Sequence, residues 1–342
     1  FTEAHAAYDW SWLDTVSTAD IASLDVTTLL PPRGKGSERH GRLLAFGLTY
    51  AALHRHSQLG VRGLKYAAIA NIVTCAFPRG AVRPSGDELR SKIKAALEGE
   101  VERLWLLLQQ EARSPGRHST NRQAHPREDH FVDGLDGGDM DVCDAEDYVP
   151  RHLIGRVLKT VVGGHFAKAW AACNTAVSSF ADTASEEVIS RLAALHPKAA
   201  TPPHLSLPVG VTPFETPEEI IRETLDALPK LRAGGVSKLT FENLGDAFNH
   251  GGDDALVALI QAINDGSADY AIFDFIGDSR LVALDKADGG VRPIAIGDAL
   301  ARVAGQCACK VLADQFARHF TSPPVGGKAH ALFPMQLGVG VK

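Results

Sequence analysis

The chain has 342 residues, of which 45% are hydrophobic and 22% are charged, and its formal net charge is −6. This length accommodates two or three domains, and no apolar run approaches the length of a membrane span or follows a charged leader. Five cysteines without a zinc spacing exclude a disulfide framework and favour structural thiols in a reducing compartment. We therefore expect a soluble intracellular protein of the cytoplasm or nucleus.

The first third of the chain reads as helical. Apolar residues recur at helical spacing in three segments, which are Leu43–His54, Leu64–Ala76 and Leu89–Ala112. The last segment carries an apolar stripe made of Ile93, Leu97, Val101 and Leu104 or Leu108. Such a stripe is typical of a helix face that packs on a core.

Two features of this region are candidates for contact with nucleic acid. A basic cluster follows Pro31 and comprises Arg33, Lys35, Arg39, His40 and Arg42. Lys and Arg neutralise phosphates, but so short a cluster is more often a solvated loop. Trp10 and Trp12 have the rings that stack on bases, although a pair of buried anchors is the more common use of tryptophan. We expect the solvated loop and the buried anchors.

The middle of the chain lacks the pattern of a folded core. Its first part is basic through Arg113, Arg117, Arg122 and Arg127. The following Glu128–Asp147 is acidic, contains no Lys or Arg, and fits no EF-hand frame. We predict a disordered linker over residues 113–148.

Helix start signals follow the linker. Thr183–Glu186 and Thr216–Glu219 have the sequence of capping boxes, and the helices behind them are predicted to stop at His196-Pro197 and near Leu228. His196 is interpreted as a helix cap rather than a catalytic residue. The proline-rich segment Ala199–Val211 predicts an extended connector.

Two acidic motifs resemble metal ligands but are better explained as structure. Gly251–Asp254 contains adjacent aspartates directly before the apolar run Ala255–Ile263, so it predicts a helix that starts at Asp253 and ends at Asn264–Gly266. Phe273–Phe275 encloses a single aspartate. We assign neither motif to a metal site.

A two-stranded hairpin is predicted next. Leu281–Leu284 is a short apolar arm, Ala287–Gly290 supplies turn residues, and the second arm runs from Val291 to Ile296. Lys286 and Arg292 flank the turn. A point charge beside a guanidinium suits a polyphosphate, whereas the alternative is a surface hairpin whose basic residues keep it soluble.

The hairpin and its sequel resemble the fingers of reverse transcriptases from non-LTR retrotransposons. In that family a strand, a glycine-containing turn and an R-P-I strand precede a helix and a Q-[LF]-G segment. The corresponding parts here are Leu281–Leu284, Asp288–Gly290, Arg292–Ile294, Asp298–Phe320 and Gln336–Gly338. The resemblance covers residues 149–342, and Gly235–Leu244 occupies the place of the family pattern A-G-P-S-G-L-R-P-E-H-L, with Val236 where proline is usual.

The resemblance implies a mostly α fold with a small β part, in which a helical N-terminal region precedes the start of a right-hand polymerase. Residues 1–112 would be the helical region, 149–200 a helical segment before the polymerase, and 201–342 a partial fingers domain. It implies that Lys286 and Arg292 contact the nucleotide triphosphate, and that Gln336 and Gly338 contact the template. The partners would be an RNA template, a DNA primer and deoxynucleoside triphosphates.

The catalytic aspartates of this family follow the Q-[LF]-G segment, and they hold two metal ions. The chain begins at Phe1 rather than Met and reaches only Lys342, so we interpret it as a fragment that binds no cofactor itself, with magnesium expected in the complete enzyme. Two alternatives stay open. One is a non-catalytic nucleic-acid-binding or scaffold protein, including a decayed element copy, and the other is an unrelated helical protein.

Overall fold

The computed structural model describes residues 7–31, 33–78, 81–113, 158, 161, 185–195, 214–228, 233–285 and 290–321. These residues are mostly helical and include two small sheets, which confirms the expected class of a mostly α fold with a small β part. The chain divides into two compact units. The first contains Phe1–His118, Pro203–Leu281 and Ala295–Lys342, and the second contains Ser119–Pro202 and Val282–Ile294.

The first unit combines elements from both ends of the sequence. Its N-terminal elements are η1 (Ser11–Thr15), α2 (Thr18–Ser23), β1 (Val26–Thr28), α3 (Lys35–Leu53), α4 (Gly60–Cys75), β2 (Ala76–Pro78), α5 (Gly86–Leu97) and α6 (Val101–Arg113). Its later elements are α10 (Glu218–Asp226), α11 (Phe241–Ala247), η4 (Phe248–Gly252), α12 (Asp253–Asn264), α13 (Tyr270–Gly277) and α14 (Ala299–Thr321). β1 and β2 pair antiparallel.

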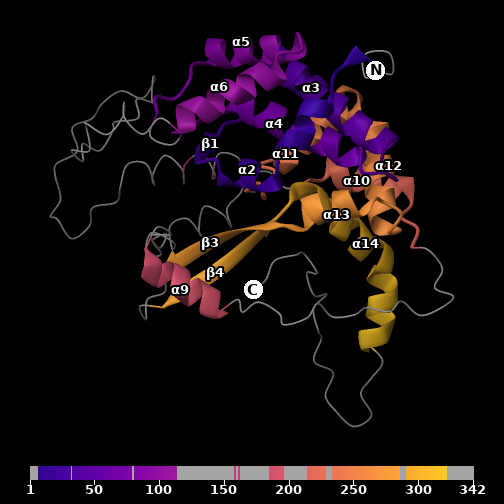
Figure 1. Cartoon of the computed structure of the whole chain (residues 1–342). Coiled ribbons are helices and arrows are strands. Elements are labelled where there is room, and N and C mark those ends of the chain that lie inside the picture. Colours follow the sequence, from indigo (N-terminus) through magenta and orange to yellow (C-terminus); the bar gives the residue numbers. More distant parts are fainter. Residues whose placement is uncertain are drawn as a thin grey trace, which may run out of the picture. The chain divides into compact units, whose positions relative to one another are not determined.

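Helix α3 is at the centre of this unit. It packs against α4, α11 and α12, so the N-terminal helices and the later helices share one hydrophobic core (Figure 1). α3 and α4 come close because glycines face each other: a Cβ on Gly63 would lie 2.4 Å from both the Ala51 nitrogen and the Gly47 carbonyl oxygen. No side chain fits there without a backbone shift.

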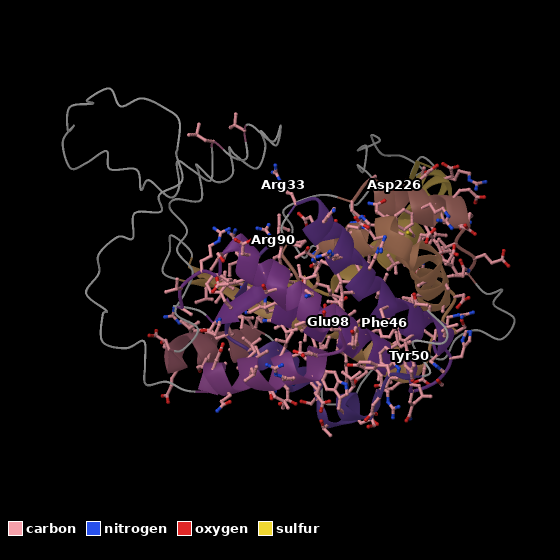
Figure 2. The ribbon with its side chains drawn as sticks, turned by 90° about the horizontal axis from the view of Figure 1, so that it is seen from above. Arg33, Phe46, Tyr50, Arg90, Glu98 and Asp226 are labelled. Atoms are coloured by element: carbon pink, nitrogen blue, oxygen red, sulfur yellow. The ribbon has the colours of Figure 1, made fainter. Side chains whose placement is uncertain are left out.

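An aromatic cluster fixes the N-terminal segment to α3. Trp10 stacks on Tyr50 with ring centroids 3.8 Å apart, and it also stacks on Phe46 at 5.4 Å. Both partners project from α3 (Figure 2). Trp10 and Trp12 are buried, as the sequence predicted, and their faces are therefore used for packing.

The helix expected over Leu89–Ala112 is wrong as a single element. The chain breaks between α5 and α6 at Gly99, whose φ of +96° belongs to the left-handed region that glycine adopts readily. Leu97, which was assigned to the apolar stripe, is 45% exposed, whereas Ile93, Val101 and Leu108 are buried. Because the chain changes direction at Gly99, the stripe residues of α5 and those of α6 do not lie on one continuous helix face.

The basic cluster after Pro31 is not a loop. Apart from Arg33, which directly precedes the N-cap, it forms the first two turns of α3, and His40 is completely buried beneath them. Arg33, Lys35, Arg39 and Arg42 remain exposed. The helix continues because residues from Leu43 onward are apolar at helical spacing and pack on α4 and α11.

Two predicted helix starts have different outcomes. α12 begins at Asp253, as expected, and both adjacent aspartates lie in its first turn, where Arg222 contacts them at 3.3 and 3.1 Å. The capping box at Thr216 is wrong, because the Thr216 hydroxyl accepts a hydrogen bond from Asn264 at 2.8 Å instead of capping α10. The tertiary contact replaces the local one.

The second unit contains α9 (Glu186–Leu195) and the greater part of the strands β3 (Ser279–Asp285) and β4 (Val291–Gly297). Val188 and Leu192 of α9 pack against the buried Ala283 and Val291, and Figure 1 shows the helix beside the strands. α9 ends at Leu195, directly before the predicted stop. The linker at 114–148, the connector at 199–211 and His196 lie outside the described residues.

Candidate functional site

The predicted hairpin is present. β3 and β4 are neighbours in a two-stranded sheet, and a connection of five residues is too short for a parallel crossover, so the strands are antiparallel. Val291 is 6% exposed, whereas the next residue, Arg292, is exposed. The alternation of a strand directs the Arg292 guanidinium to solvent while Val291 anchors the strand.

Of the four site residues predicted from the sequence, the structure places Arg292. Lys286, Gln336 and Gly338 lie outside the described residues. A triphosphate contact through Lys286 and a template contact through Gln336 and Gly338 therefore stay predictions.

Asp298 lies between β4 and α14 and fixes the start of α14. One of its carboxylate oxygens accepts a hydrogen bond from the Leu300 backbone at 2.9 Å and thereby caps α14. The other accepts a hydrogen bond from the Ser237 hydroxyl. Burial raises the pKa of the Asp298 carboxyl, while the Ser237 and backbone hydrogen bonds oppose the rise.

Ser237 belongs to a tight turn that lies against the start of α14. A Cβ on Gly235 would lie 2.7 Å from the Asp298 nitrogen and Cα, so glycine is required for this approach. Lys238 has a φ of +60°, and within the described residues no other non-glycine residue has a positive φ. The turn is followed at once by α11, which Thr240 and Asn243 cap reciprocally.

A buried hydrogen bond connects this turn with α4, and a buried histidine of α3 lies next to it. The Asn71 side-chain amide donates to the Lys238 carbonyl at 3.2 Å, and Asn71 is 1% exposed. His40 lies beside Asn71, and burial lowers the pKa of its imidazole to about 4, an effect that Asn71 only partly opposes. His40 is therefore neutral at physiological pH.

A small cavity of about 120 Å³ opens beside Asn71 and the turn. It is lined by Thr28, Leu29, Leu30, Asn71, Thr240, Glu242 and Asn243. Its polar side chains are two amides, two hydroxyls and a carboxylate, which suit a neutral hydrogen-bonding group better than a phosphate. None of the residues that line the cavity is Lys, Arg or His, so the lining has no positive charge that could bind an anion.

Metal and redox chemistry have little support in the described part of the chain. No group of three or more His, Cys, Asp or Glu side chains there is placed to hold a metal ion. Cys75 and Cys307 are buried and Cys309 is half-buried, and burial raises the pKa of all three thiols. Of the two acidic motifs considered in the sequence, Asp253 and Asp254 pair with Arg222 at the start of α12, and Asp274 is an exposed residue of α13.

The sequence analysis missed the residues that hold the turn. Asp298 carried a usable signal, because an aspartate directly before an apolar helix is a common N-cap. Asn71 is a polar residue in an apolar stretch of α4, which hinted at a buried partner. Ser237 gave no local signal, since its partner lies 61 residues away, and His40 gave none because its burial depends on contacts with other elements.

No described helix combines the length and the hydropathy that crossing a lipid bilayer requires. Comparisons of the chain with protein-family models, with curated proteins and with solved structures found no match.

Proposed function

We propose that this chain is part of a retrotransposon RNA-directed DNA polymerase and that the β3–β4 hairpin is the nucleotide-facing element of its fingers. The order of elements supports the proposal: a tight turn lies upstream of the hairpin and a long helix follows the hairpin, as the resemblance implies, with α11, α12 and α13 between the turn and the hairpin. Arg292 is exposed on the second strand, where a phosphate can reach it.

The backbone at Lys238 carries most weight. When the family pattern A-G-P-S-G-L-R-P-E-H-L is laid on Gly235–Leu244 with its serine on Ser237, its second glycine falls on Lys238. That residue has a φ of +60°, a conformation that favours glycine. The conformation of this turn is thus the one that the family's glycine would adopt, although the side chain differs. The contact of Gly235 and Ser237 with Asp298 joins the turn to the hairpin exit and α14, so two stretches that carry the resemblance pack together.

Nucleotide binding by the hairpin is the direct test. We expect a deoxynucleoside triphosphate with magnesium to slow proteolysis between β3 and β4, because the phosphates would bridge basic residues on both arms. Replacing Arg292 by Ala should weaken this protection about ten-fold or more, as expected for the loss of one charge-assisted hydrogen bond to phosphate. The readout is binding rather than synthesis, because synthesis needs carboxylate-bound metal ions that the family carries after the Q-[LF]-G segment.

A matched control is Arg90→Ala. Arg90 is an exposed arginine of α5 that pairs with Asp87 at 2.5 Å, and its replacement removes the same charge from another element. Equal protection by nucleotide in wild type, Arg292→Ala and Arg90→Ala would contradict the proposal. RNA binding without any nucleotide effect would favour the non-catalytic nucleic-acid-binding protein instead.

A further inference from the structure

The start of α3 bears cations that the fold does not use. We define the α3 basic end as Arg33, Lys35, Arg39 and Arg42, all of which are exposed. Arg42 pairs with Glu38 at 2.7 Å. Arg33, Lys35 and Arg39 have no carboxylate partner within the described residues.

Three cations of α5 and α6 on the same unit do have carboxylate partners. On α5 and α6, Arg90 pairs with Asp87, Lys94 with Glu98 and Arg103 with Glu100, at distances of 2.5 to 3.7 Å. The α3 basic end is thus a local excess of positive charge on a chain whose net charge is −6. Whole-chain charge therefore does not argue against an anionic partner at this place.

The placement of these cations is unfavourable for the helix itself. Lys35 is the first residue of α3 and Arg39 is one turn later, where the helix dipole disfavours positive charge and where like charges four apart repel. The N-cap residue, Gly34, has a φ of +71° and supplies no side-chain cap. A bound polyanion would relieve both effects.

The geometry points to the phosphate backbone of a nucleic acid strand, and we infer that the α3 basic end binds it. Lys35, Arg39 and Arg42 follow one another at helical spacing and extend over about 10 Å at 1.5 Å per residue. Each strand of a duplex carries one phosphate per about 3.4 Å of helix axis, so an array of this length beside the axis spans about three of them. Figure 2 shows Arg33 at the edge of the helical body.

The support for the array is rigid. The opposite side of the same two turns buries Gly36, His40 and Gly41, and a Cβ added to Gly41 would lie 2.4 Å from the Asp246 carbonyl oxygen. The cations are therefore presented by a fixed helix, which lowers the ordering cost of binding. This surface needs no nucleotide and does not rest on the polymerase assignment.

The test is fluorescence anisotropy of the chain with a labelled single-stranded RNA of about 20 nucleotides at several salt concentrations. The variant Arg33→Gln/Lys35→Gln/Arg39→Gln should bind about ten-fold more weakly, and its salt slope should be lower by about two, at about 0.7 per lost phosphate contact. The variant Arg90→Gln/Lys94→Gln/Arg103→Gln removes three charges from α5 and α6 and should change neither quantity.

The charge-keeping variant Arg33→Lys/Arg39→Lys should retain most of the affinity for RNA. If these side chains acted only in folding, keeping their charge would not by itself preserve the affinity. Equal weakening by the two triple variants would overturn the inference, because net charge would then explain the binding. Binding to phosphatidylserine vesicles is measured for the same variants. If the triple α3 variant lost vesicle binding but bound RNA as wild type does, the inference would be overturned in favour of a membrane surface. Nucleotide protection of the hairpin should survive in the α3 variant, so the two proposals fail separately.

Discussion

The described residues of the two units bury their apolar side chains to very different extents. In the first unit, α3 packs on α4, α5, α11 and α12, and the core includes fully buried residues such as Leu13, Ile69 and Leu256. In the second, the described core consists of Ala283 and Val291 with Val188 and Leu192 packed on them. A two-stranded sheet covered only by these described residues is marginal by itself. The helical unit can therefore present a fixed surface, whereas the hairpin has the small local stability that a ligand can change.

The α3–α4 interface should be the most sensitive place in the helical unit. Replacing Gly63 by Ala puts a Cβ 2.4 Å from the Ala51 nitrogen and the Gly47 oxygen, and both atoms belong to backbone that cannot rotate away. We expect the free energy of unfolding to fall by about 3 kcal/mol or more, as measured by urea denaturation.

The control for this change is Gly245→Ala. Gly245 lies in α11 and has no atom within 4 Å of the Cβ position. Alanine should stabilise the helix there by up to about 1 kcal/mol. Similar destabilisation by both substitutions would mean that α3 and α4 are less closely packed than the glycine contacts imply.

His40 should make the stability of the helical unit depend on pH. Its pKa is about 4 in the folded chain and 6.5 as the ordinary value, so the unfolded chain binds the proton more readily. The stability linked to His40 is complete above pH 6.5 and is lost as the pH falls toward 4, by up to about 3 kcal/mol. The free energy of unfolding of His40→Leu should therefore fall less than that of wild type between pH 7 and pH 4.

Carboxyl groups also titrate between pH 7 and pH 4, but wild type and His40→Leu share them, so their contributions to the free energy of unfolding cancel in the comparison. Asp298 is among them, and its raised pKa acts in the opposite direction. If the free energies of unfolding of wild type and His40→Leu changed equally with pH, the His40 imidazole would not be held in its neutral form by burial.

The hairpin should respond locally. Replacing Val291 by Ala removes two carbon atoms from the small core of the second unit, at about 0.8 kcal/mol for each buried group. We expect faster amide hydrogen exchange in β3, β4 and α9, with the unfolding midpoint of the helical unit unchanged. A uniform increase in exchange through α3 and α4 would instead show that the hairpin and the helical core unfold together.

Local signals were sufficient for several elements. The apolar periodicity of Leu64–Ala76 and the aspartates at the start of α12 predicted helices close to α4 and α12, whereas the periodicity of Leu43–His54 predicted only the later part of α3. The resemblance implied a helix over Asp298–Phe320, which is close to α14. The turn residues between Leu284 and Val291 predicted the hairpin. In each case the information lies within one or two helical turns or within one strand pair.

Long-range contacts decided the places where the predictions were wrong. Thr216 has the sequence of an N-cap, yet Asn264, which is 48 residues away, binds its hydroxyl. The basic cluster reads as a polar loop because the apolar residues that hold its helix in place come from α4 and α11. Leu97 fits a helical stripe, but Gly99 ends the helix and leaves this side chain exposed.

A mostly helical chain with one basic hairpin, and a family resemblance around that hairpin, follow from the order of the amino acids. Folding in three dimensions adds that residues before Arg113 and after Phe214 share a core, that Ser237 meets Asp298, and that His40 is buried under an exposed row of cations. The difference arises because periodicity and turn chemistry act between near neighbours, whereas burial depends on which distant surfaces meet.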